Sequence, residues 1–251
     1  MTMRIEWRNG ASSIGNNDMV LLAFPGVGNV GKVALESLWK LNPTEVIARL
    51  HPSGLPPLAK LDEDGLLSPP HLTLSKIKTE GGSHLITLTG PSQPNDSNAQ
   101  SQMAEELMLF FQEQGVRDVV VLAGMIDSPD RKDTFMVASS ASHRIDMESM
   151  GIDVRRNEPK GGALGVAALI ASMGPLFEMN TSCVITTTVG SSGDILASQR
   201  MIEHLDRWYS LGLNLPEEGN EWLKRRLEEM SPKKKIDLVS EISSSHDAFY
   251  M

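Results

Sequence analysis

The sequence predicts an α/β fold in which a mainly parallel β-sheet is covered by helices on both faces. Short apolar runs bounded by turn residues alternate with longer segments whose apolar residues recur at helical spacing. Such alternation is typical of parallel sheets with helices on both sides. A chain of 251 residues, 40% of them hydrophobic, can also bury a substantial core without disulfides or metals.

The first half of the chain contains four predicted strands and two predicted helices. The apolar run at 19–24 ends at Pro25, and the helix after it ends at Asn42-Pro43, because proline cannot continue a helix. A helix through 103–111 has apolar residues at spacing i, i+4, i+7 and i+8, and Gly115 can end it. The other strands are predicted at 45–50, 72–77 and 84–89.

The second half continues the alternation. The apolar strand at 119–122 completes a second β-α-β unit, a connection that is normally right-handed. Asp194 can cap the helix after it, because its side chain can accept a hydrogen bond from a backbone N–H of the first turn. The remaining elements are predicted as strands at 134–138, 152–155 and 183–189, and as helices at 141–150, 163–173, 195–211 and 217–230.

Two segments stand apart from this alternation. Residues 51–70 hold five prolines and predict a long ordered loop with at most a short hairpin, which we expect to contact another subunit. Ser231-Pro232 ends the last predicted helix, and a Lys-rich and then Ser-rich stretch follows. We therefore predict one α/β domain over 1–230 and a flexible tail over 231–251.

Composition and charge exclude several classes of protein. The formal charge of −9 argues against a nucleic-acid-binding protein, because phosphate contacts need clustered cations. No apolar run approaches the roughly 18 residues of a membrane span, and the first residues lack the pattern of a signal peptide. The single cysteine, Cys183, excludes an internal disulfide. We expect a soluble cytoplasmic protein.

Two glycine-rich turns are candidates for binding an anion or a small ligand. Gly26, Gly28 and Gly31, with Asn29 between them, match G-x-G-x-x-G between a strand and a helix, the context of a dinucleotide site. The acidic residue expected at the end of the next strand is missing, so a tight, closely packed turn is the alternative. A second strand–turn–helix junction contains Gly190, Ser191, Ser192 and Gly193, whose backbone N–H groups could hold an anion.

The sequence offers no convincing catalytic group. The six histidines show no zinc-binding spacing, and no G-x-S-x-G motif is present, so we expect neither a metal nor a local hydrolase nucleophile. Asp127, Asp130 and Asp133, near Arg131 and Lys132, could form a catalytic cluster, but a solvated loop is the simpler interpretation.

The last three residues, Phe249, Tyr250 and Met251, are the most distinctive feature. Tyrosine occurs only twice in the chain, so a hydrophobic residue followed by tyrosine at this place is improbable by chance. Such a segment could dock into a partner, with the ring of Phe249 burying apolar area, Tyr250 filling a slot and the carboxylate pairing with a cation. From Ser231, an extended tether reaches at most roughly 65–70 Å.

The segment from Phe24 to Lys32, FPGVGNVGK, strongly resembles the opening of the proteasome assembly chaperone 2 family. The run PSGLPP at 52–57 resembles that family's second block, and Leu88-Thr89-Gly90 before a helix is similar to its third. Residues 161–175, Gly193-Asp194 and the helices ending near Met230 fit its C-terminal half. The resemblance covers about residues 18 to 230.

This resemblance implies a nucleoside-phosphorylase-like α/β fold without established catalysis or cofactor, self-association, and a role in assembling or binding proteasome rings. Some family members end in a hydrophobic-Tyr-any motif that docks between α-subunits of the proteasome core particle, and Phe249, Tyr250 and Met251 match its three positions. We therefore expect a non-enzymatic assembly chaperone or activator-like factor that forms homo-oligomers. The alternative is an enzyme that binds a nucleoside or nucleotide at the carboxyl edge of the sheet.

Overall fold

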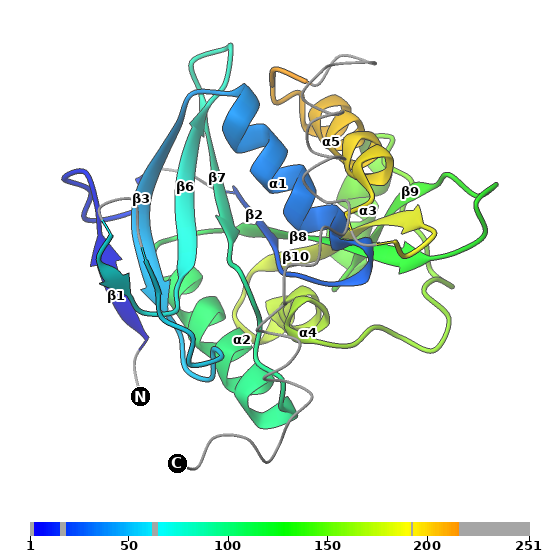
Figure 1. Cartoon of the computed structure of the whole chain (residues 1–251). Helices are drawn as coiled ribbons and strands as arrows, with labels where there is room; N and C mark the ends of the chain where they lie inside the picture. Colours follow the sequence, from blue (N-terminus) through cyan, green and yellow to red (C-terminus); the bar gives the residue numbers. More distant parts are fainter. Residues whose placement is uncertain (1–2, 16–18, 62–64, 192, 216–251) are drawn as a thin grey trace.

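The computed structural model describes residues 3–15, 19–61, 65–191 and 193–215, which form a sheet with helices on both faces (Figure 1). The strands of the main sheet are β1 (Arg4–Trp7), β2 (Met19–Ala23), β3 (Thr44–His51), β6 (Leu72–Lys78), β7 (His84–Thr89), β8 (Asp118–Ile126), β9 (Thr134–Ala138) and β10 (Asn180–Thr188). The helices are α1 (Val30–Leu41), α2 (Ser97–Glu113), α3 (Ala141–Ser149), α4 (Val166–Met173) and α5 (Ile195–Tyr209), with short 3-10 turns η1 (Val27–Asn29) and η2 (Gly174–Leu176).

Among the described residues the main sheet has eight strands in the order β1-β3-β6-β7-β2-β8-β10-β9. The central strands β7, β2, β8 and β10 pair in parallel, and β3 points the same way. The other three strands, β1, β6 and β9, run antiparallel to their neighbours. The predicted α/β class with a mainly parallel sheet is therefore confirmed, and the carboxyl ends of β2, β8 and β10 lie at one edge.

Helices α1 and α5 cover one face of the sheet and α2 and α4 cover the other (Figure 1). In β2, Val20 and Leu22 belong to the core under α2 and α4, whereas Leu21 and Ala23 belong to the core under α1 and α5. Successive side chains of a strand point to opposite faces, so a strand buried on both sides must be apolar at every position. This requirement explains the continuous apolar run that predicted the strand.

Side-chain caps set the start of three helices. Asp96 accepts a hydrogen bond from the backbone N–H of Ala99 at 2.9 Å, and Asp194 accepts one from Ala197 at 2.9 Å. Ser140 does the same for α3. These caps satisfy N–H groups that the first turn of a helix leaves without an intrahelical partner. The predicted capping role of Asp194 is therefore confirmed.

Some predicted elements differ from the structure. The N-terminal strand β1 was not predicted, and residues 152–155 form no strand beyond an isolated bridge between Val154 and Met136. The fourth helix starts at Val166 rather than 163, because Gly161, Gly162 and Gly165 hold positive φ angles that a right-handed helix does not allow. The predicted helix at 217–230, the domain boundary at 230 and the tail over 231–251 lie outside the described residues.

The described residues of the proline-rich segment 51–70 form a loop with a short hairpin, as predicted. Its hairpin pairs β4 (Lys60–Leu61) with β5 (Leu67–Ser68). Its first residues are fixed to α2, because the buried carboxylate of Glu106 accepts hydrogen bonds from the N–H of Ser53 at 2.8 Å and from its hydroxyl at 2.9 Å. The hairpin leaves Leu61, Leu66 and Leu67 69%, 65% and 75% exposed.

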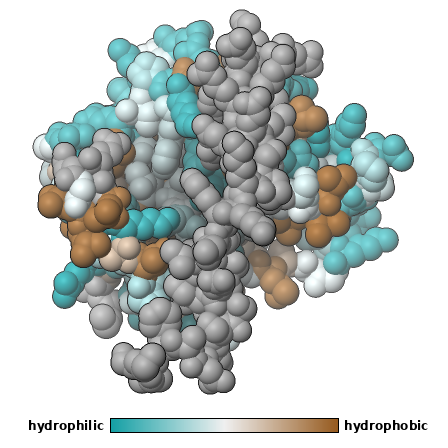
Figure 2. Space-filling model, viewed as in Figure 1, coloured by the Kyte–Doolittle hydropathy of each residue, from teal (hydrophilic) through white to brown (hydrophobic). Residues whose placement is uncertain are grey.

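In the coloured part of the face drawn in Figure 2, hydrophilic residues are common and apolar residues gather near both sides. Within the described ranges, no helix is both long enough and apolar enough to cross a lipid bilayer.

Candidate functional site

Three strand ends meet at one edge of the sheet, since β2, β8 and β10 are parallel neighbours. Turn η1 follows β2, and a second glycine-rich turn connects β10 to α5. The carbonyl oxygen of Gly28 accepts hydrogen bonds from the backbone N–H groups of Gly193 at 3.1 Å and Asp194 at 2.9 Å. The two turns, predicted as separate candidate loops, therefore form one structure.

The structure places six of the predicted loop residues in these two turns, namely Gly26, Gly28, Asn29, Gly190, Ser191 and Gly193, and Gly31 in the first turn of α1. Ser192 lies outside the described residues, as do Phe249, Tyr250 and Met251.

The glycines at 28 and 31 allow close packing of the backbone. A Cβ atom at Gly31 would lie 2.3 Å from the carbonyl oxygen of Leu122 in β8, so helix α1 approaches the sheet more closely than any larger residue permits. Gly28 has a φ of +60°, and a Cβ there would lie 2.9 Å from the hydroxyl of Thr188. These glycines thus have a packing role that needs no ligand.

Several backbone N–H groups that a phosphate would need are already bonded within the protein. The N–H of Gly26 donates to the side chain of Asn29 at 3.2 Å, and the N–H of Asn29 donates to the carbonyl of Gly26 at 2.9 Å. Strand β3, whose end would carry the acidic residue of a dinucleotide site, is separated from β2 by β6 and β7. This geometry favours a tight structural turn over a dinucleotide site.

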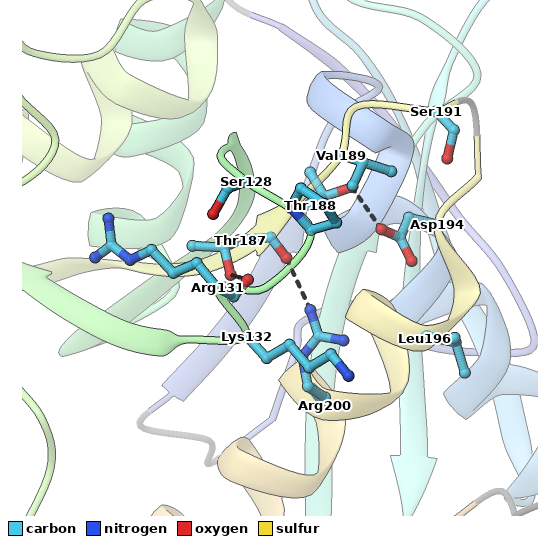
Figure 3. A pocket seen from close by; sticks show the side chains of 11 residues that line it. Ser128, Arg131, Lys132, Thr187, Thr188, Val189, Ser191, Asp194, Leu196 and Arg200 are labelled. Atoms are coloured by element: carbon cyan, nitrogen blue, oxygen red, sulfur yellow. Dashed lines mark hydrogen bonds between the residues drawn. The ribbon is translucent and has the colours of Figure 1, made fainter.

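A pocket of about 220 Å³ lies beside these turns, between the β8–β9 loop and the start of α5 (Figure 3). Its polar lining includes Ser128, Lys132 and Ser191, and Arg200 reaches it from α5. Asp194 also lines it, but both of its carboxylate oxygens already accept hydrogen bonds, from Ala197 and from the hydroxyl of Thr188 at 2.6 Å.

An ion-pair cluster stabilises the β8–β9 loop next to the pocket. Arg131 contacts Asp127 at 2.7 Å, Asp133 at 2.8 Å and Glu158 at 2.6 Å. Arg155 contacts Asp133 and Glu158, both at 2.9 Å, so the two arginines link the loop to the segment before α4. Asp127 and Asp133 were candidates for a catalytic cluster, and here they are carboxylates bound to arginines.

Hydrogen bonds from Arg131, and then from Arg155, lower the pKa of both Asp133 and Glu158 below the ordinary range. The pKa of Asp127 is lowered mainly by a hydrogen bond from the backbone N–H of Ser128. Carboxyl groups with lowered pKa values remain ionised near neutral pH and are weak bases. The cluster is thus suited to holding the loop rather than to transferring protons.

We expect Asp133→Asn to weaken the acid dependence of stability. A carboxyl group whose pKa is lower in the folded state stabilises the protein above its unfolded pKa, and this stabilisation is lost as pH falls through the folded pKa. The melting temperature of the wild type should therefore exceed that of the variant at pH 7, and the difference should shrink as pH falls below about 4. Asp130→Asn, in the same loop, is the control and should follow the wild-type profile. A constant difference in melting temperature between wild type and Asp133→Asn across this range would show that protonation of Asp133 does not control the acid dependence of stability.

The other candidate groups are not arranged for catalysis or metal binding. Cys183 packs against the core, and burial of its thiol raises its pKa to about 12, so the thiolate is scarce at neutral pH. Among the described residues, no group of three or more His, Cys, Asp or Glu side chains could hold a metal ion.

The model of the PAC2 family matches residues 20–233 of this chain. The chain belongs to the PAC2 family. A curated relative, the uncharacterized protein MJ1210 of Methanocaldococcus jannaschii, is 21% identical over 201 residues, which cover 80% of this chain and 77% of the relative. The family suggested by the FPGVGNVGK segment is thereby confirmed.

Two solved structures of Pyrococcus furiosus have the same fold as this PAC2 protein. PbaB, an archaeal proteasome activator, has a TM-score of 0.72 and 20% identity, over 96% of this chain and 98% of PbaB. PbaA, an archaeal homolog of proteasome-assembly chaperone, has a TM-score of 0.67 and 18% identity, over 96% of each chain. At these identities the likeness establishes the fold.

Sequence reasoning missed Arg200 and Arg155 as members of this edge of the sheet. Arg200 lies within a regular amphipathic helix, where a cation usually marks the solvent face. Arg155 lies in a segment predicted as a strand. No local motif could have linked either residue to the β8–β9 loop, because only the tertiary fold brings them together.

Proposed function

We propose that this PAC2 protein binds the proteasome core particle and acts as an assembly chaperone or activator-like factor rather than as an enzyme. The observation that supports this most strongly is the fold similarity to PbaB, which extends over 96% of this chain and 98% of that protein. PbaB is named as a proteasome activator, and PbaA as a homolog of proteasome-assembly chaperone. A cytoplasmic location is part of the proposal, and the single cysteine, which fits a reducing compartment, supports it.

In this proposal Phe249, Tyr250 and Met251 dock between α-subunits of the core particle. The body holds the start of the intervening segment firmly, because Asn42 and Asn214 exchange hydrogen bonds of 2.8 and 3.2 Å. The 36 residues from 216 to 251 follow this anchor. Beyond the helix predicted at 217–230, the predicted tail from Ser231 spans at most roughly 65–70 Å when extended. Docking of the last three residues therefore does not require the body to touch the same pocket.

A competition experiment tests this docking. A synthetic peptide of residues 243–251 should displace the intact protein from purified core particle, and the same peptide with Tyr250→Ala should not. Displacement can be followed by fluorescence anisotropy of the labelled full-length protein. If both peptides displace it equally, or if neither does at millimolar concentration, binding does not depend on Tyr250 in the way proposed.

We further propose that the protein self-associates, so that several weakly binding segments act together through their high effective concentration. The exposed leucines of the β4–β5 hairpin, Leu61, Leu66 and Leu67, offer an apolar contact for a second copy.

The double variant Leu66→Ser/Leu67→Ser should lower the molar mass measured by analytical ultracentrifugation, because it removes apolar area from this contact. Leu164→Ser changes a leucine that is 98% exposed elsewhere on the surface and should leave the mass unchanged. An unchanged mass in the hairpin variant would exclude this hairpin as the subunit contact.

A further inference from the structure

We infer that the pocket between the β8–β9 loop and α5 binds a small organic phosphate, most simply a phosphate monoester. This site goes beyond the proposed proteasome binding, because it lies in the folded body and uses none of the residues at 249–251. Its charge comes from side chains, Lys132 and Arg200, rather than from the glycine-rich backbone.

Three cationic residues line this pocket, Arg131, Lys132 and Arg200, and the last two have no ion-pair partner among the described residues. Lys132 comes from the β8–β9 loop and Arg200 from the second turn of α5, and Figure 3 shows both side chains extending into the same region. Within the described ranges Lys132 is exposed and makes no ion pair. Its neighbour Arg131, by contrast, is fully engaged by Asp127, Asp133 and Glu158.

The guanidinium of Arg200 is held in place but is not satisfied. One Nη donates to the carbonyl of Thr187 at 2.8 Å, which fixes the group at the end of β10. Its buried Nε–H has no acceptor among the described residues, although buried donors are nearly always paired. Arg200 also has no carboxylate partner among the described residues, so its charge is available to a ligand. A phosphoryl group against the guanidinium would supply both the missing acceptor and the counter-charge.

The rest of the lining fits a phosphate ester better than a bare ion. Ser128 and Ser191 also line the pocket, so its wall has polar groups besides the two cations. Exposed apolar side chains of Val189 and Leu196 also line it and offer a surface for an organic group. The volume of about 220 Å³ exceeds what a phosphate group alone would fill.

Asp194 is the one acidic side chain lining the pocket, and its position does not prevent anion binding. Both of its oxygens accept hydrogen bonds within the protein, and the two free cations outnumber it. Lys132, Arg200 and Asp194 together leave one net positive charge, which favours an anionic ligand.

The test is isothermal titration of the full-length protein with phenyl phosphate, inorganic phosphate and benzoate. We expect saturable binding of phenyl phosphate with a Kd of about 1 mM or tighter, weaker binding of inorganic phosphate, and no binding of benzoate. If benzoate binds as tightly as phenyl phosphate, the ligand class is not phosphate. If phenyl phosphate shows no saturable binding, the pocket is not the proposed binding site.

Variants then locate the binding. Lys132→Gln and Arg200→Gln should each weaken phenyl phosphate binding by about tenfold, because each removes a charged hydrogen-bond donor. Arg207→Gln removes the same charge from an exposed position on the same helix and should leave binding unchanged. Since Arg200 also bonds to β10, its variant could fail to fold, and the exposed Lys132 then decides the outcome. Unchanged binding in Lys132→Gln, or an equal loss in Arg207→Gln, would overturn the assignment.

Discussion

Replacing Gly31 with alanine should lower the free energy of unfolding by about 3 kcal/mol. The new Cβ would lie 2.3 Å from the carbonyl oxygen of Leu122, so helix α1 or strand β8 must move. Both elements pack in the core formed by α1 and α5. Alanine gains up to about 1 kcal/mol over glycine from helix propensity, but this gain is smaller than the cost of the overlap. Urea denaturation followed by circular dichroism measures the difference.

Gly26→Ala is the matched control from the same G-x-G-x-x-G motif. Gly26 has an extended φ of −169°, and its added Cβ would meet only the carbonyl of Phe24, at 3.8 Å. We expect its unfolding free energy to stay within about 0.5 kcal/mol of the wild type. Equal stability of the two variants would show that close packing does not explain Gly31.

Tyr250→Ala should reduce affinity for the proteasome core particle by at least about tenfold. Tyrosine is enriched among interface residues whose truncation is costly, since it combines a large apolar ring with a hydroxyl. If several copies bind together, the loss multiplies, because each subunit contributes its own docking segment. Surface plasmon resonance with immobilised core particle measures the change.

Ser244→Ala, seven residues from the end of the sequence, is the control for this prediction and should bind like the wild type. Thermal melting of both variants should match the wild type, because both positions lie in the tail predicted at 231–251, after the predicted domain. A Tyr250→Ala variant that retains wild-type affinity would remove this residue from the interface.

The fold was predictable from the sequence where local pattern and tertiary burial agree. Strand β2 and the 119–122 part of β8 are buried on both faces, so these positions are all apolar and the run is visible without knowledge of the partners. Helix α2 was predictable from its amphipathic spacing, although it starts earlier, at Ser97, and α5 from the capping Asp194 before an amphipathic segment.

Elements whose state depends on distant partners were not predictable in the same way. Strand β1 has a mixed composition and exists because it pairs antiparallel with β3 at the edge of the sheet. Residues 152–155 have strand-like composition, but Arg155 is drawn into the ion cluster with Asp133 and Glu158. Local composition cannot show either partner.

The candidate site was predicted only in part, for the same reason. The glycine-rich turns were found from their spacing, since a strand–glycine–helix junction is a local pattern. The hydrogen bonds from Gly193 and Asp194 to Gly28 join the two turns. These bonds depend on the strand order, in which β2 and β10 flank β8. Lys132 and Arg200 are 68 positions apart and meet only through that same arrangement.

The most direct test of proteasome binding compares the intact protein with a chain that lacks Phe249, Tyr250 and Met251. Each is mixed with purified proteasome α-rings, and bound protein is measured by co-sedimentation. We predict that the intact protein sediments with the rings and that the shortened chain, equally well folded, stays in the supernatant. Equal sedimentation of both chains would contradict docking through these residues, and no sedimentation of either would contradict proteasome binding itself.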